Sequence, residues 1–390
     1  MSLNNVTLTA AVRQNLLSLQ GTANLLSQTQ ERLATGKKVN SALDNPTNFF
    51  TAAGLDARAS DISNLLDSIG NGVQVLQAAN TGITSLSSLV DTAKSIANQV
   101  LQQPSGFTTH STSTSTALVG TANAANLVDG VGIKSGETIS FGASGSLPAL
   151  TITFGATESL AQLNTALAPG DLTASIDSTN HLVFTTTNDA AGSTIGTITV
   201  AGTAGSTTFG AGTAPTPDAV SQSTRANLVT QYNQILTQIT TTAQDASFNG
   251  INLLNGDELK LVFDETGKST LTISGVTFNP AGLGLSNLTA GTDFIDNNTT
   301  NNVLTALNTA SVTLRSQASA FGANLSIVQI RQDFNKNIIN VLQTGSGNLT
   351  LADANEEAAN SQALSTRQSI ATSALALANQ SQQNVLQLLR

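Results

Sequence analysis

Apolar residues recur at alternating steps of three and four at both ends of the chain, and this spacing restricts the fold more than any other feature. Such steps mark the seam of a coiled coil. The spacing therefore predicts that both ends are helices that pack against other helices. At the first end the seam runs through Val12, Leu16, Leu19, Ala23, Leu26, Gln30 and Leu33. At the other end it runs through Ile370, Ala374, Leu377, Ser381 and Leu388, with Val385 and Leu389 in the same segment.

Two further seams lie inside the chain and predict long helices. Asn45 offers an N-cap and Pro46 suits the first helical position, so one helix is expected to begin there and to end before Pro104. At 1.5 Å per residue, a helix over 46–103 is roughly 85 Å long, which suits a bundle or a fibre better than a globular core. The predicted bundle residues are Ile62, Leu66, Ile69, Val73 and Leu76 in this helix and Leu304, Leu307, Leu314, Phe321, Leu325 and Val328 in a later one.

Glycines and acidic residues predict where the helices end. Gly36 suits a left-handed C-terminal cap. Residues 345–347 (Gly-Ser-Gly) are expected to interrupt the later helix, and Thr350 is expected to cap the last one. Acidic residues near the start of that last helix could mimic a catalytic carboxylate site, but negative charge at a helix N-terminus explains them more simply. These acidic residues are Asp353, Glu356 and Glu357.

The middle of the chain, 104–220, is rich in Thr, Ser, Gly and Ala and predicts an inserted α+β domain. An amphipathic helix carries Leu160, Leu163 and Leu167. A flexible linker is the alternative for such a composition, but the regular alternation of Ile, Leu and Phe argues against it. The expected strands are 138–141, 150–154, 172–176, 182–186 and 195–200.

We also expect a helix over 224–243 and a hairpin over 259–276 that turns at 265–268. The predicted fold class is mainly α with an α+β insertion. It consists of long paired helices from both termini, a β-hairpin in the bundle domain and one small solvent-facing α+β domain.

The composition disfavours catalysis and several classes of partner. Charged residues make up only 10% of the chain, and there are two histidines and no cysteine. A net charge of −9 disfavours binding to nucleic acid or to anionic lipid. We therefore expect no enzymatic activity, no cofactor, no metal and no membrane span. The first residues, 1–7, lack the basic and apolar segments of a secretory signal peptide, so any export is expected to use another route.

Two local features resemble a metal site and a phosphate-binding loop, but each has a simpler structural explanation. His110 and His181 both lie in the insertion, with no metal-binding motif around them. Residues 267–269 (Gly-Lys-Ser) end like a phosphate-binding loop, but Val262 stands where that loop needs its first Gly, so a hairpin turn is favoured.

A helix with one apolar stripe is marginal until a partner covers the stripe, because ordering a residue costs ~1–2 kcal/mol of backbone entropy. We infer that the two ends pair with each other and with neighbouring subunits. An intramolecular bundle, a coiled-coil adhesin and a helical cargo adaptor share this pattern, and periodicity alone does not separate them.

Several long sequence motifs distinguish between these alternatives. The chain closely resembles the bacterial flagellins near its start, at 31–42 (Glu-Arg-Leu-Ala-Thr-Gly-Lys-Lys-Val-Asn-Ser-Ala) and at 69–80. Residues 246–256, which include Phe248, Asn249 and Gly250, resemble a further flagellin segment, and 376–390 resemble the flagellin C-terminus. The resemblance covers about 1–103 and 221–390. One departure is that the insertion precedes the Phe-Asn-Gly segment, whereas it follows that segment in the best-known enterobacterial pattern.

The resemblance implies a non-enzymatic subunit of the extracellular flagellar filament, exported unfolded by a type III apparatus. It implies an inner domain of 1–40 plus 350–390, a bundle of 41–103 plus 221–349, and an outer domain of 104–220. Implied partners are other flagellin subunits, an export chaperone, and the cap and junction proteins. It also places Thr92 where receptor-activating flagellins carry a key Arg, which predicts weak or no recognition by the innate receptor.

Two rival functions remain open at this point. The hook–filament junction protein of the same family shares the helical ends. A surface-displayed binding protein built on the same scaffold would need a site in 104–220, where saccharide binding through Asn and Thr is the remaining option.

Overall fold

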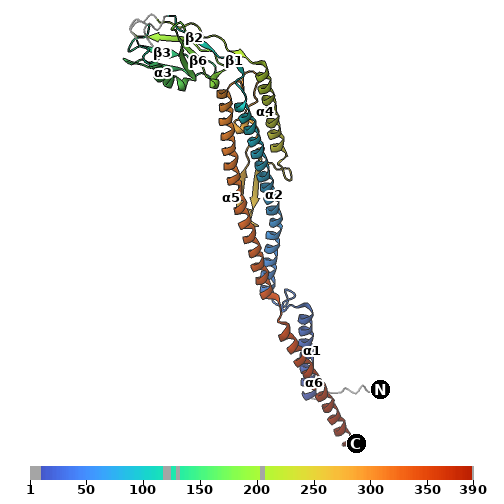
Figure 1. Ribbon diagram of the computed structural model, residues 1–390. Coiled ribbons are helices and arrows are strands. Elements are labelled where there is room, and N and C mark those ends of the chain that lie inside the picture. Colours follow the sequence, from blue (N-terminus) through green and yellow to red (C-terminus); the bar gives the residue numbers. More distant parts are fainter. Residues whose placement is uncertain (1–9, 117–123, 129–131, 203–206, 389–390) are drawn as a thin grey trace. The chain divides into compact units, whose positions relative to one another are not determined.

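The computed structural model describes residues 10–116, 124–128, 132–202 and 207–388. The chain divides into two compact units, treated separately below. The first comprises Met1–Gly70, Leu261–Leu271 and Val328–Arg390, and the second comprises Asn71–Lys260 and Thr272–Ile327. Helices dominate, and the strands are short, so the predicted class, mainly α with an α+β insertion, is confirmed (Figure 1). The helices are α1 (Ala10–Thr35), α2 (Pro46–Gln102), α3 (Leu160–Leu167), α4 (Ala219–Asp245), α5 (Asn297–Thr350) and α6 (Ala354–Leu388).

The start of α2 follows from the local sequence. Asn45 Oδ1 accepts a hydrogen bond from the Asn48 amide at 3.0 Å, and Pro46 occupies the first helical position, as predicted. The preceding connection is held by Asp44, whose carboxylate accepts from the amides of Asn40 and Ser41 at 2.9 Å each. Gly36 adopts φ +69° just after α1, which confirms the expected left-handed cap.

The prediction of a break at 345–347 is wrong. Helix α5 continues through this segment to Thr350, and Thr350 does not cap α6. The cap is Asp353, whose Oδ1 accepts from the amide of Asn355 at 2.8 Å. The segment is packed in the first unit: a Cβ on Gly345 would lie 3.4 Å from Leu55 Cδ1, an ordinary contact distance, and Ser346 is buried. Packing of α5 against α2 therefore supports the helix here, despite glycine's low helix propensity.

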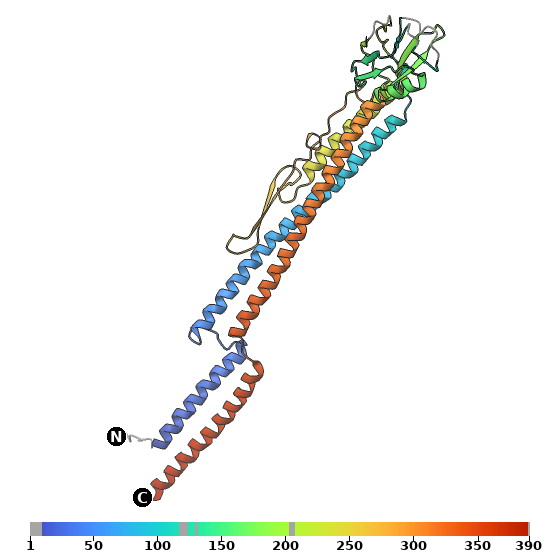
Figure 2. The same cartoon turned by 90° about the vertical axis from the view of Figure 1, so that its left-hand side faces the viewer.

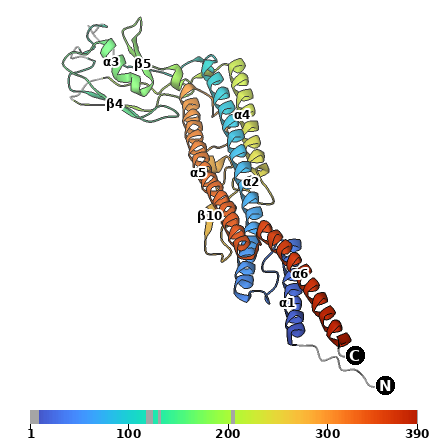
Figure 3. The ribbon, with the colours of Figure 1, turned by 90° about the horizontal axis from the view of Figure 1, so that it is seen from below.

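In the first unit, α1 and α6 lie side by side in all three views (Figures 1, 2 and 3). Their connections are tied together where Lys38 N donates to Thr350 O at 2.7 Å. Arg32 on α1 forms an ion pair with Glu357 on α6 at 3.3 Å. A second small core joins α2 to α5 through Ala59, Ile62 and Leu342.

In the second unit, α2, α4 and α5 form the bundle (Figure 2). Helix α4 begins at Ala219 rather than at 224, because Asp218 caps it by accepting from Ser221 N at 3.2 Å. This first turn could not be predicted from apolar periodicity, because its apolar residue, Val220, is 75% exposed and does not belong to the core. Residues of α2 with no exposed surface are Ile69, Ala79, Leu86, Val90, Ala93, Ala97 and Val100, all but Ile69 in this unit.

The hairpin is β9 (Glu258–Val262) and β10 (Thr270–Ser274), close to the predicted limits. Its turn is closed by Asp264, whose Oδ1 accepts from Ser269 N at 2.8 Å, and by Gly267 at φ +71°. In the first unit, Phe263 is held by Asn335, whose Nδ2 donates to its carbonyl oxygen at 3.0 Å, and Arg331 lies 5.8 Å from the centre of its ring.

The insertion contains two antiparallel three-stranded sheets, in the orders β2-β6-β5 and β4-β3-β7, which share one core with α3. Leu163, Leu182 and Phe184 have no exposed surface, which excludes a flexible linker for the described part of this segment. Strand β7 begins three residues later than expected, and β1, β2 and β8 were not predicted. The strands are β1 (Phe107–Thr109), β2 (Thr112–Thr114), β3 (Thr138–Phe141), β4 (Leu150–Thr153), β5 (Leu172–Ile176), β6 (Leu182–Thr186), β7 (Ile198–Ala201) and β8 (Thr216–Pro217).

Candidate assembly surface on the first unit

Pairing of α1 with α6 buries little of their apolar surface. Val12 is 3% exposed, whereas Leu16, Leu19 and Leu26 are only half-buried and Leu33 is 42% exposed. On α6, Ile370 is 64% exposed and Leu377 is 70% exposed. Val385 and Leu388 belong to α6 but their side chains lie outside the described part, as does residue Leu389. A two-helix contact thus leaves most of the predicted seam partly open to solvent.

Two exposed apolar residues on α1 were missed by the search for heptads. Leu17 is 68% exposed and Leu25 is 54% exposed. A step of eight residues turns about 80° round a helix of 3.6 residues per turn, so the two side chains point in different directions, and both lie off the predicted seam. The signal was present in the sequence, but a search for steps of three and four selects only one seam.

One exposed face of α6 alternates large and small side chains. This shallow, open face is formed by Thr366, Ser369, Ile370, Ser373, Ala374 and Leu377. The small residues between the two large ones leave room for a side chain from another helix, which is how knobs insert into holes in a coiled coil. The face belongs to α6 alone and therefore needs no other element to form it.

Exposed apolar residues also mark the connection to α2 and the far part of α5. Leu43 is 96% exposed and Phe50 is 66% exposed. On α5, Ile330, Phe334 and Val341 are each more than half exposed and follow at steps of four and seven, so they share a face. Together with Leu17 and Leu25 on α1 and with Ile370 and Leu377 on α6 they belong to the exposed apolar surface of the first unit. Many large apolar side chains left exposed in one unit are a feature of interaction sites in soluble proteins.

The predicted bundle residues lie mostly in the interior. Buried positions among them are Ile62, Ile69, Leu76, Leu307, Leu314, Phe321 and Val328, and half-buried positions are Leu66, Val73, Leu304 and Leu325.

The Phe-Asn-Gly segment forms a tight turn after α4. Phe248 and Ile251 exchange backbone hydrogen bonds of 3.0 Å, while Asn249 and Gly250 take φ values of +50° and +80°. Positive φ is the physical reason for Asn and Gly at these positions. Phe248 itself is 36% exposed.

Thr92 lies on the exposed face of α2. Its hydroxyl donates to Ser88 O at 2.9 Å, so the side chain is turned back onto its own helix. The neighbouring Asp91 and Lys94 form an ion pair of 3.6 Å.

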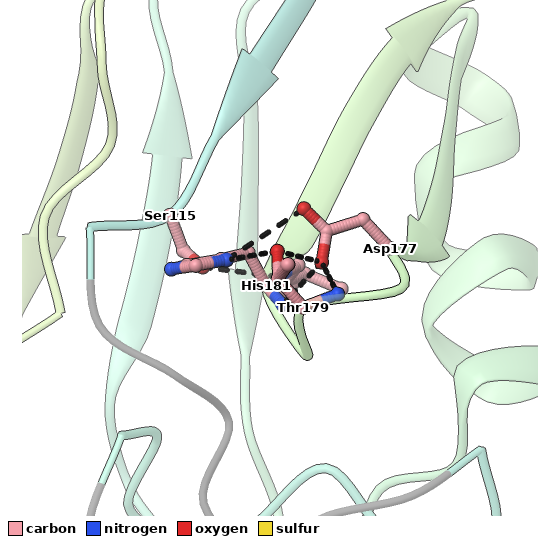
Figure 4. Close-up of polar contacts among 5 residues, drawn as sticks. Ser115, Asp177, Thr179 and His181 are labelled. Atoms are coloured by element: carbon pink, nitrogen blue, oxygen red, sulfur yellow. Dashed lines mark hydrogen bonds and ion pairs between the residues drawn. The ribbon is translucent and has the colours of Figure 1, made fainter.

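The two histidines stabilise loops of the insertion. His110 Nδ1 lies 2.6 Å from Thr186 O. His181 follows the turn between β5 and β6, where Asp177 Oδ1 accepts from the His181 and Thr179 amides at 2.8 Å (Figure 4). These backbone donors hold the pKa of Asp177 below its usual value, and the His181 ring adds to the effect.

Ser115 completes the group in Figure 4, and its role is also structural. Its Oγ accepts from Leu182 N at 3.0 Å, which fixes the edge of the sheet. Across the described ranges, no three side chains of the metal-binding types gather into a possible site. None of the helices in those ranges has the length and apolarity needed to traverse a bilayer.

Comparison with known proteins identifies the two helical regions. Residues 4–126 match the profile of the bacterial flagellin N-terminal helical region, and residues 304–389 match that of the C-terminal helical region. Flagellins FljM and FljK of Caulobacter vibrioides are 30% and 29% identical to the chain over 164 residues, which is 42% of this chain and 59% of each relative. Flagellin A of Rhizobium meliloti is 38% identical over 77 residues, 20% of each chain.

The matches to the Caulobacter proteins thus span less than two thirds of those relatives. The two profiles, however, cover more than half of the 390 residues, at the two ends and in the order expected from the motifs. The paired helices α1 and α6 and the long helices α2 and α5 lie wholly or largely within the matched regions. The chain is therefore a member of the bacterial flagellin family.

Proposed function

We propose that this chain is a structural, non-enzymatic subunit that polymerises with further copies of itself into the flagellar filament. The observation that carries the proposal is the exposed apolar surface of the first unit, above all Leu17, Leu25, Ile370 and Leu377. These side chains are each more than half exposed even though their helices are already paired. A pair of helices that leaves such side chains exposed gains stability from further helices of the same kind.

The magnitudes favour several helical partners for these four side chains. Full burial of one Leu or Ile side chain contributes about 1.5–3 kcal/mol relative to full exposure. Four such residues per subunit, meeting equivalents on several neighbours, can offset the cost of ordering the helices on association. The small residues between Ile370 and Leu377 leave room for a side chain from a neighbouring copy.

Negative-stain electron microscopy after seeded polymerisation tests the proposal. We expect long filaments from the intact chain and none from a version trimmed to 46–343, which lacks α1 and α6. An intact chain that stays monomeric in the presence of seeds contradicts self-assembly.

The hook–filament junction protein is the second candidate, because it shares the helical ends by family resemblance. Filament length separates the two: a junction protein is expected to form only short stubs on the same seeds. The resemblance of 383–390 to the flagellin C-terminus favours the filament subunit.

The place and route of action belong to the same proposal. We infer an extracellular filament, reached by export of the unfolded chain through the flagellar type III apparatus with a dedicated chaperone and assembled with cap and junction proteins. The complete absence of cysteine supports this route, since no disulfide can block threading. Secretion into the medium by a strain that carries or lacks the export gate tests it.

Weak or absent recognition by the innate receptor follows from Thr92. A hydroxyl that is bonded to Ser88 O cannot replace an Arg as a charge-assisted donor. A receptor reporter assay should show little signal, and strong activation at low concentration would contradict this assignment.

A further inference from the structure

A small polar pocket lies in the second unit, between α4, the loop that follows the hairpin, and the start of α5. Its volume is about 240 Å³, several times the ~30 Å³ that one water occupies in the liquid. Tyr232 comes from α4, Leu285 and Asp293 from the loop, and Asn302 and Val303 from α5. The pocket is therefore a product of the fold, with walls from three separate segments.

The walls of the pocket are fixed by hydrogen bonds. The Asn233 side chain donates to Leu288 O at 2.8 Å and accepts from Leu288 N at 2.9 Å. Asp293 Oδ2 accepts from Thr289 N at 2.7 Å, and Asp293 N donates to Thr289 O at 2.9 Å. A ligand entering this pocket has little ordering cost to overcome, because the loop is already held in place.

Tyr232 carries a polar group that the surrounding structure does not satisfy. Its side chain is 1% exposed, and its ring packs edge-to-face on Phe294, with centres 5.8 Å apart. The hydroxyl makes no hydrogen bond to any of the described residues. The hydroxyl oxygen is not one of the buried side-chain atoms that lack a partner, so solvent in the pocket reaches it, and a ligand in the pocket can replace that solvent as its partner. Burial and the nearby Asp293 raise the pKa of Tyr232 to about 12, which keeps the hydroxyl neutral.

The pocket carries a negative charge, and none of the described lining residues is positively charged. Among the described residues that line it, Asp293 is the only one with a charged side chain. Arg225 on α4 is engaged elsewhere, since it donates to Phe294 O at 2.8 Å and to Pro104 O at 3.1 Å. The remaining wall includes Leu285 and Val303, which are apolar. One carboxylate beside apolar side chains suits an organic cation better than a metal ion, which requires six or more oxygen ligands in the case of Ca²⁺.

We propose that this pocket binds an alkylammonium or alkylguanidinium group. The N–H donors of the head group meet the Asp293 carboxylate and the Tyr232 hydroxyl, and its methylene groups lie against Leu285 and Val303. Such a group is found on a free amine and on a Lys or Arg side chain of a second copy. This site lies outside the assembly surface, so the test of ligand binding does not depend on whether the chain polymerises.

The sequence provides a direct probe, because Tyr232 is the only tyrosine and the chain has no tryptophan. Tyrosine fluorescence and the NMR signals of a ¹³C-labelled tyrosine ring therefore report on this pocket alone. Unpolymerised full-length chain is titrated with butylammonium, with butylguanidinium and with n-butanol as the neutral control. We expect a saturable change with both cations and none with butanol.

Variants separate charge recognition from loss of structure. Asp293→Asn should weaken binding at least tenfold, whereas Asp333→Asn, at an exposed α5 position of the first unit, should leave it unchanged. Because Asp293 also holds the loop, Val303→Phe provides a second test: it fills the pocket from α5, keeps the Asp293 contact with Thr289, and should also abolish binding.

The outcomes decide the proposal. A lack of saturable change, an equal response to butanol, or unchanged binding by Asp293→Asn would mean that the pocket holds only solvent. A response to added amine at all protein concentrations assigns a free amine as the source. A ring-signal change that grows with protein concentration without added amine, and disappears in Asp293→Asn, assigns a side chain of a second copy.

Discussion

At the scale of single residues, Asn252 shows how one side chain can end a helix. It is 6% exposed, and its Nδ2 donates to Ala243 O at 2.8 Å and to Gln244 O at 2.9 Å, two carbonyl groups in the last turn of α4. Its Oδ1 accepts from Leu254 N at 2.9 Å. One side chain thus connects α4 to the segment that follows the Phe-Asn-Gly turn.

Replacement of Asn252 by Ala should lower the free energy of unfolding by about 2–4 kcal/mol, because three backbone groups lose their partner in a buried position. Urea denaturation followed by circular dichroism measures the change. Asn355→Ala on α6 is the matched control, since Asn355 is exposed and no hydrogen bond of its side chain is seen. Equal stability of the two variants would contradict the capping role.

Asp177 makes the turn between β5 and β6 sensitive to acid. The His181 amide, the Thr179 hydroxyl and amide, and the His181 ring lower its pKa from the ordinary 3.8. A depressed folded pKa contributes stability that is complete above 3.8 and is lost as the pH falls through the folded value. NMR of the Thr179 and His181 amides should therefore show the turn intact at pH 3.8 and opening only below it. Loss of these signals near pH 5 would contradict the assignment.

At the scale of elements, two glycines of α2 differ in their surroundings, and the difference distinguishes the effect of helix propensity from the effect of packing. Gly54 has no neighbour within 4 Å of an added Cβ, whereas a Cβ at Gly82 would lie 2.6 Å from Ala246 Cβ and from Leu254 Cδ1. Close approach of α2 to the segment after α4 therefore requires glycine at 82.

Gly54→Ala should raise the free energy of unfolding by about 0.5–1 kcal/mol, because alanine is the better helix former. Gly82→Ala should lower it by about 1–3 kcal/mol through overpacking. Thermal and urea denaturation of the two variants compare the effects in one helix. A similar gain in both would show that the segment after α4 moves aside without cost.

The elements were predictable to different degrees. The long helices followed from periodicity and from Asn45-Pro46, because a cap and a seam are local signals. The continuation of α5 through Gly345 was not predictable, since it depends on packing against Leu55. The short strands β1, β2 and β8 gave no alternation to detect, and β1 is formed only by pairing with β8, about a hundred residues away.

At the scale of the whole molecule, the sequence predicted that the helical ends need partners but not which side chains remain exposed. The seam positions Ile370 and Leu377 were predicted and lie exposed, while Leu17 and Leu25 were missed because they lie off the seam. The pocket at Tyr232 was also beyond the sequence, since residues more than fifty positions apart form it. The three-part domain division and the packing role of each seam residue remain predictions.

The critical concentration for polymerisation tests the central claim most directly. We would compare the intact chain with Ile370→Ser/Leu377→Ser and with the matched control Val220→Ser, whose side chain is 75% exposed on α4, by sedimentation of seeded samples. Loss of about 1.5–3 kcal/mol per buried side chain predicts at least a tenfold rise for the double variant, and no change beyond twofold is expected for the control. A double variant that assembles at the same concentration as the intact chain would contradict assembly through the exposed face of α6.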